Sequence, residues 1–155
     1  MKSLFSRLIP TLAAAALMAA GSAQALTETC QVTDEKVIAG LFDRWNASLK
    51  TLDPAKVTAN YASDGVLLAT VSNTPRTNHA EISDYFVKFL KNQPQGSIDK
   101  RFIKIGCNVA HDVGTYTFGF KDGSKVSARY SYVYAFRDGQ WLISHHHSSA
   151  MPEAK

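Results

Sequence analysis

The sequence predicts one α+β domain in which N-terminal helices pack on a strongly curved antiparallel β-sheet. Residues 33–50 carry apolar side chains at three- and four-residue intervals, which is the spacing of one helix face. From residue 97 onward the pattern changes to long β-rich runs separated by turn residues. A chain of 155 residues is long enough for one such domain and too short for two.

Three helices and a short strand are predicted before the sheet. The first helix, over residues 33–50, begins at the capping residue Asp34, and its apolar face consists of Val37, Ile38, Leu41, Phe42, Trp45 and Leu49. A short second helix over about 54–61 begins with a proline, which suits a first helical turn. A strand over 66–71 and a third helix over about 78–91 follow.

The C-terminal half is interpreted as a meander of four long strands. They are predicted over residues 98–110, 113–121, 125–137 and 140–149. The turns between them hold His111-Asp112, Asp122-Gly123 and Asp138-Gly139. An Asp-Gly pair favours the positive φ angles of a tight hairpin, so the last two strands should pair directly.

Strict alternation along this last hairpin sorts its side chains into two faces. Before the turn, the aromatic face contains Tyr130, Tyr132, Tyr134 and Phe136, and the other face contains Arg129, Ser131 and Val133. After the turn, one face contains Trp141, Ile143, His145 and His147. We expect Arg129, His145 and His147 to face a cavity covered by the first helix. The aromatic face would then lie outside and need cover, which predicts a homo-oligomer of at least two chains.

The first 25 residues have the pattern of a secretory signal peptide. Lys2 and Arg7 supply a positive start, residues 8–20 are almost wholly apolar, and Ala23-Gln24-Ala25 is a small-x-small cleavage site. We therefore expect residues 26–155 to form the mature domain, in the periplasm or outside the cell. The apolar run is too short for a comfortable membrane span, so no membrane association is expected after cleavage.

The charge of the mature chain gives no reason to expect nucleic-acid binding. Removing Lys2 and Arg7 from the 17 basic residues leaves 15, against 13 acidic residues. No basic run or stripe is visible in the sequence.

The two cysteines, Cys30 and Cys107, are predicted to form a disulfide. An even cysteine count in an exported protein favours a bond, and this one would tie the segment before the first helix to a central strand. The sequence contains no CxxC motif, so a redox-active pair is not expected.

Three consecutive histidines, His145, His146 and His147, are open to three interpretations. The first is a pocket floor in which His145 and His147 act as catalytic acid or base. The second is a metal site, but the sequence shows no third ligand converging on the pair. The third is hydrogen bonding at a subunit interface. We assign no metal and no cofactor.

Arginines are candidates for holding an anionic group of a ligand. Arg129 would be a buried cation if its strand face is concave, and a buried guanidinium needs an acidic side chain or a ligand carboxylate. Arg76, in the loop before the third helix, is a second candidate. An ordinary surface cation is the alternative for both.

Four further residues are predicted to contact a ligand: Trp45, Asn46, Tyr61 and Tyr116. The Trp45 indole N–H needs a partner if it is buried, and Asn46 in the middle of a helix indicates a buried hydrogen bond. The two tyrosines, and Tyr85 in the third predicted helix, could place hydroxyls at a pocket mouth, with core packing as the alternative for Tyr85 too. Core packing is the alternative for the tryptophan and for both tyrosines.

Several stretches of the chain resemble a known family, the association domain of calcium/calmodulin-dependent protein kinase II, and above all its exported bacterial stand-alone relatives. These stretches are LFDRWNASL, DGVLLATVSNTPRT, IGCNVA and RDGQWLISHHHSSAMP, within residues 30–152. The resemblance implies the cone fold of the nuclear transport factor 2-like superfamily, with a curved sheet around a long helix and a pocket at the open end. That superfamily also holds SnoaL-type polyketide cyclases, ketosteroid isomerases and scytalone dehydratase.

The resemblance implies an oligomerisation module, not a kinase. The chain has no Gly-rich phosphate loop and no HRD or DFG motif, and no GxGxxG fingerprint supports a dinucleotide cofactor. We therefore predict an exported homo-oligomer with a cone pocket for a small ligand, for which an anion is one candidate.

The alternative is a SnoaL-like or scytalone-dehydratase-like lyase, isomerase or cyclase that uses a pocket histidine. The sequence shows no inward-facing acid, since Asp112, Asp122 and Asp138 are interpreted as turn residues, so proton transfer would depend on histidine.

Overall fold

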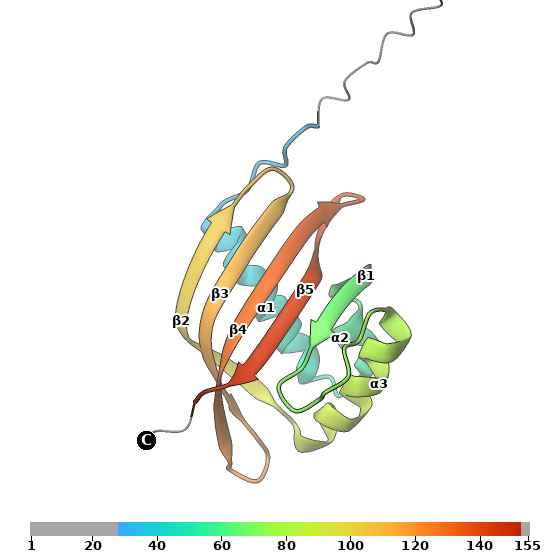
Figure 1. Cartoon of the computed structure of the whole chain (residues 1–155), viewed down its shortest axis with the longest axis vertical. Helices are drawn as coiled ribbons and strands as arrows, with labels where there is room; N and C mark the ends of the chain where they lie inside the picture. The colour runs from blue at the N-terminus through green and yellow to red at the C-terminus, as the bar shows by residue number, and fades with distance from the viewer. Residues whose placement is uncertain (1–27, 153–155) are drawn as a thin grey trace, which may run out of the picture.

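Helix α1 (Glu35–Leu49) lies across the concave face of a curved five-stranded sheet (Figure 1). This computed structural model describes residues 28–152, so the predicted signal peptide, residues 1–25, lies outside the described residues. The other helical elements are α2 (Pro54–Thr58), α3 (His79–Phe89) and the single turn η1 (Leu90–Asn92). In the described part of the chain, no helix has the length and apolar character needed to cross a membrane.

The sheet has the strand order β1-β5-β4-β3-β2. Its strands are β1 (Tyr61–Leu68), β2 (Gln95–Ile105), β3 (Val109–Gly119), β4 (Lys125–Arg137) and β5 (Gln140–Ala150). β2 to β5 form the predicted antiparallel meander, while β1 pairs with β5 in parallel. The α+β class and the cone-like arrangement of helices on a curved sheet are thus confirmed.

Local sequence signals set the helix starts. Asp34 accepts a 2.8 Å hydrogen bond from the Val37 N–H, and Asn78 accepts a 3.0 Å bond from the Glu81 N–H. The strand predicted over 66–71 begins and ends earlier, because β1 includes residues 61–65 and carries a register irregularity between Tyr61 and Val66.

The aromatic face of β4 is turned inward, which reverses the predicted orientation of this strand. Tyr130, Tyr132 and Tyr134 are at most 3% exposed and pack in the core with Phe42 and Trp45 of α1. The reason is energetic: the apolar stripe of α1 must be buried, and the aromatic face offers far more apolar area than the face bearing Arg129 and Ser131. The expectation that aromatic side chains lie outside was therefore wrong.

A β-bulge at Ser144 sets the orientation of the histidines. Tyr134 pairs with Ile143 and Val133 pairs with His145, so Ser144 is an extra residue in β5. One extra residue reverses the alternation of side chains beyond it. Trp141 and Ile143 therefore face inward together with His146 and Ser148, whereas His145 and His147 face outward.

The turn between β2 and β3 lies at residues 106–108, earlier than predicted. Asn108 has a left-handed φ of 55°, and the Gly106 N–H donates to the Val109 carbonyl at 2.8 Å. Asp112 is consequently a strand residue and not a turn residue. Its side chain points inward and is fully buried, so the expectation that no strand carries an inward acid was also wrong.

The predicted disulfide between Cys30 and Cys107 is present. It fastens the segment before α1 to the β2–β3 turn. The Asn108 side chain reinforces this attachment, accepting from the Gln31 N–H at 2.8 Å and donating to the Thr29 carbonyl at 2.9 Å.

Candidate functional site

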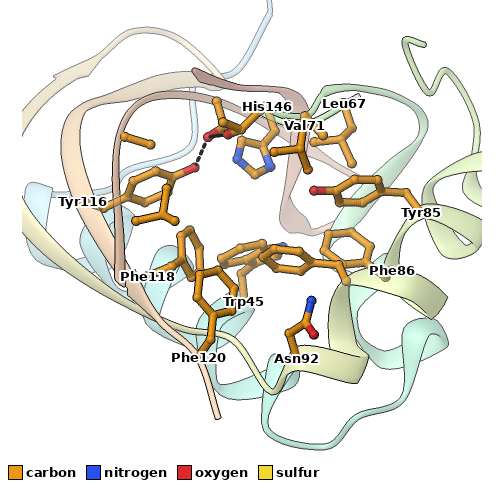
Figure 2. A pocket seen from close by; sticks show the side chains of 16 residues that line it. Trp45, Leu67, Val71, Tyr85, Phe86, Asn92, Tyr116, Phe118, Phe120 and His146 are labelled. Carbon is orange, nitrogen blue, oxygen red and sulfur yellow. Dashed lines mark hydrogen bonds between the residues drawn. The ribbon is translucent and has the colours of Figure 1, made fainter. Parts of the chain in front are cut away.

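A cavity of about 240 Å³ opens between the concave face of the sheet, α1 and α3 (Figure 2). Its walls are mainly aromatic and aliphatic. The lining residues are Trp45, Leu67, Ala69, Thr70, Val71, Tyr85, Phe86, Phe89, Asn92, Tyr116, Phe118, Phe120, Val126, Ala128, His146 and Ser148. Among these described residues none is Asp, Glu, Lys or Arg, so the cavity is apolar and uncharged.

Residues distant in sequence form the walls because each element presents one face to the cone interior. Trp45 comes from the buried stripe of α1, Tyr85 from α3, Tyr116 from β3, and His146 from β5 beyond the bulge. Val71, in the loop after β1, lines the cavity and is 82% exposed, so it lies at the mouth. Figure 2 shows the rings of Tyr85, Tyr116 and His146 directed toward the same open space.

His146 is held rigidly in the cavity wall. Its Nδ1 shares a 2.8 Å hydrogen bond with the Tyr61 hydroxyl, and its ring stacks on Tyr132 at a centroid distance of 4.1 Å. Burial, with smaller contributions from His145 and His147, lowers the pKa of His146 to about 3. The imidazole is therefore neutral at physiological pH, and its buried Nε2 has no hydrogen-bond partner among the described residues.

The hydrogen bond of Tyr61 indicates which tautomer His146 adopts. The Tyr61 hydroxyl has no other hydrogen-bond partner among the described residues, so its proton is used only if it donates to His146 Nδ1. This donation leaves the His146 proton on Nε2.

A second polar group on the wall is already internally paired. The Tyr116 hydroxyl donates to the Ser148 Oγ at 2.6 Å, and Ser148 also contacts the Thr70 hydroxyl. Burial raises the pKa of Tyr116 far above its ordinary value, so its hydroxyl stays protonated. These linked hydrogen bonds stabilise the cavity wall and leave the three hydroxyls little capacity to bond a ligand.

Tyr85, in contrast, has a free hydroxyl. It makes no hydrogen bond to any residue in the described range, although burial raises its pKa to about 12, with a smaller opposing effect of Arg76. The cavity therefore offers polar groups that no other described side chain uses: the Tyr85 hydroxyl, the His146 Nε2 and the side-chain amide of the exposed Asn92.

Of the predicted ligand-binding residues, Trp45 and Tyr116 line the cavity. Tyr61 does not line it and acts through its bond to His146. Asn46 has a structural role: its amide donates to the Gly96 carbonyl at 2.8 Å and accepts from the Gly96 N–H at 2.9 Å, joining α1 to β2. The predicted buried hydrogen bond of Asn46 is thus present, but away from the cavity.

The predicted catalytic and anion-binding residues do not reach the cavity. His145 and His147 lie on the outer face of β5, and the exposed Arg129 donates to the Ala150 carbonyl, at 3.3 Å, and to no other residue in the described range. The bulge at Ser144 and the inward aromatic face place all three there. Arg76 forms a backbone bridge with Leu67, and its guanidinium donates to the Thr74 carbonyl at 2.9 Å.

His146 and Ser148 are cavity residues that were not predicted from the sequence, whereas Tyr85 lines the cavity as one of the candidate tyrosines. The greater hydrophobicity of one β4 face would have predicted that the tyrosines face inward. Only the bulge at Ser144 brings His146 and Ser148 to the same side of the sheet as these tyrosines. Within residues 28–152, no group of three or more His, Cys, Asp or Glu side chains is placed to hold a metal ion.

The neutrality of His146 predicts a specific pH dependence of stability. The folded-state pKa is depressed to about 3, while that of an unfolded histidine is near 6.5, so between these values the unfolded chain binds more protons. The free energy of unfolding should therefore fall as pH decreases below about 6.5, and His146 should account for roughly 2.5 kcal/mol by pH 4.5.

Urea unfolding from pH 7 to pH 4.5 measures this effect. His146→Gln should flatten the decrease, whereas His147→Gln, at an exposed position, should not. An unchanged slope in His146→Gln would show that other groups cause the pH dependence.

Comparisons with known proteins agree with this architecture. The sequence profile described as "Calcium/calmodulin dependent protein kinase II association domain" matches residues 34–152. A Xanthomonas campestris structure provisionally described as such a domain is 45% identical, with a TM-score of 0.75, and covers 84% of this chain and 100% of its own. No curated protein matches.

More distant structures share the fold alone. A nuclear transport factor 2-like protein from Salmonella enterica is 16% identical with a TM-score of 0.65, covering 77% of this chain and 92% of its own. A Novosphingobium aromaticivorans protein provisionally described as an aromatic ring hydroxylase is 20% identical with a TM-score of 0.66, covering 80% and 94%.

Proposed function

Because this chain belongs to the calcium/calmodulin-dependent protein kinase II association-domain family, we propose that it is an exported homo-oligomeric module that binds a small ligand in its cone cavity. Family membership concerns the association domain alone, and the chain carries no kinase motif. The signal-peptide pattern supports export, and the Cys30–Cys107 disulfide is compatible with an oxidising compartment.

The observation that carries the ligand-binding part is the cavity itself. A volume of about 240 Å³ with apolar walls and a few convergent polar groups has the character of small-molecule sites. Naphthalene should raise the Tm of the wild-type protein but not that of Ala128→Leu, because the larger side chain at this buried lining position would occupy the cavity. Equal responses of the two proteins in a thermal-shift titration would contradict binding there.

The outer face of the sheet is the surface we propose for self-association. In cross-strand register it presents an apolar patch interrupted by imidazoles and by Ser131, with Lys104 at its edge. The patch residues are Val66, Leu68, Phe102, His111, Val113, Val133, His145 and His147. Phe102, on edge strand β2, is 65% exposed. Such a patch on a member of an association-domain family supports contact with a second copy.

A buried charge at the centre of this patch should disrupt the assembly. Val133→Glu places a carboxylate between His111 and His145 without disturbing the core, so we expect a smaller particle by gel filtration with light scattering at micromolar concentration. Val87→Glu, at a 47% exposed position on α3, is the matched control and should leave the mass unchanged. A monomeric wild-type protein would refute self-association.

The alternative lyase, isomerase or cyclase function has less support from the cavity. His145 and His147 lie outside it, and His146, with a pKa of about 3, is a weak base that carries no proton to donate as an imidazolium at neutral pH. Asp112 is inward but does not line the cavity. The arrangement therefore favours binding over proton transfer.

A further inference from the structure

The residues that line the cavity restrict the chemical class of its ligand. None of the described lining residues is formally charged, and the nearest candidate cations predicted from sequence are elsewhere: Arg129 lies on the outer face and Arg76 is engaged with the Thr74 carbonyl. A carboxylate or phosphate entering this cavity would lose its hydration and meet no charged lining residue, since Arg76, whose charge acts on the Tyr85 phenol, lies outside the lining. Burial of an unpaired anion is strongly unfavourable, so the site selects against anionic ligands.

Arg101, the remaining inward arginine of the described sheet, cannot supply that charge. Its Nε lies 3.1 Å from Asp112 Oδ2, and its guanidinium stacks over Phe42 at 5.6 Å from the ring centroid. Neither Arg101 nor Asp112 lines the cavity. The pair is therefore internally neutralised, and a ligand in the cavity does not meet it.

Two of the uncommitted polar groups are hydrogen-bond donors, while the third, the amide of the exposed Asn92, can both donate and accept. The Tyr85 hydroxyl has no partner among residues 28–152 and can donate. His146 carries its proton on Nε2 when Tyr61 donates to Nδ1, so this lining residue then holds a second donor, which is buried and has no partner among the described residues. Because burial keeps both groups in their neutral forms, they retain this character across the physiological pH range.

We propose that the cavity binds an uncharged aromatic or alicyclic molecule whose single carbonyl or ether oxygen accepts hydrogen bonds from Tyr85 and His146. The proposal rests on the proposed ligand-binding function and specifies its ligand. The apolar body of the molecule contacts Trp45, Phe86 and Phe118, and its oxygen lies toward the wall formed by α3 and β5. The ligand fills apolar volume and completes two hydrogen bonds that the protein alone leaves unmade.

Three probes of one shape test this class by calorimetric titration at pH 7: 2-acetylnaphthalene, naphthalene and 2-naphthoate. We expect 2-acetylnaphthalene to bind at least tenfold more tightly than 2-naphthoate and severalfold more tightly than naphthalene. Tyr85→Phe should reduce the affinity for the ketone about fivefold and leave that for naphthalene unchanged. Folding should tolerate this variant, because the Tyr85 hydroxyl bonds to no described residue.

Tyr134→Phe is the matched control. It removes a hydroxyl that is buried without a partner and does not line the cavity, so it should not affect any of the three affinities. Tighter binding of 2-naphthoate would overturn the uncharged class while the pocket function stands. Equal affinities for ketone and naphthalene, unaffected by Tyr85→Phe, would overturn the role of the donors. If none of the probes binds, the ligand-binding function fails together with its refinement.

Discussion

Replacing Arg101 with methionine is expected to lower the free energy of unfolding by about 3 kcal/mol, because it leaves the buried carboxylate of Asp112 without its counter-charge. Asp112 is fully buried, and its carboxylate accepts from Arg101 Nε at 3.2 Å and from the Tyr130 hydroxyl at 2.8 Å. Burial raises the pKa of Asp112, and the hydrogen bond from Tyr130 and the charge of Arg101 oppose that rise. Without the guanidinium, the neutral Tyr130 hydroxyl would have to stabilise the negative charge of Asp112.

A double-mutant cycle separates this electrostatic effect from lost packing. Arg101→Met combined with Asp112→Asn removes both charges and keeps an acceptor for Tyr130, so it should regain a large part of the loss. Arg137→Met is the control, since its ion pair with Asp64 is about half exposed and should contribute less than about 1 kcal/mol. Additive single effects in urea unfolding would mean that Arg101 stabilises the fold by packing alone, over Phe42.

The helices and turns of this fold are predictable because their signals are local. The capping side chain of Asp34, the apolar spacing of α1 and the Asp138-Gly139 turn each act within a few residues. Asp138 and Gly139 indeed have φ values of 51° and 80°, as a two-residue hairpin requires.

The cavity could not be predicted in the same way, because single-residue shifts decide which side chains face it. The extra residue at Ser144 moves His146 inward and its two neighbours outward, and no sequence pattern marks it. Because the β2–β3 turn was predicted too late in the sequence, Asp112 was interpreted as a turn residue. Gly106 and Asn108 are turn-forming residues that could have located the turn correctly. Strand alternation is therefore reliable only between irregularities of the sheet.

Opening the Cys30–Cys107 disulfide is expected to cost about 4 kcal/mol. The bond joins residues 77 positions apart, and on the chain-entropy model a loop of this length restricts the unfolded chain by about that amount. In the folded state the bond holds the segment before α1 against the β2–β3 turn, where Asn108 has its left-handed conformation. The disulfide therefore has two effects: it attaches the segment before α1 in the folded state, and it restricts the unfolded ensemble.

Guanidinium unfolding of the wild type and of Cys30→Ser/Cys107→Ser measures this contribution. A thiol reductant should lower the stability of the wild type to that of the double variant and leave the variant itself unchanged, which excludes general effects of the reductant. Asn108→Gly provides a comparison, because it removes the polar clamp on Thr29 and Gln31 while the covalent bond remains and the left-handed φ is tolerated, and it should cost much less. A loss below about 1 kcal/mol in the double variant would show that these hydrogen bonds, not the disulfide, attach the segment.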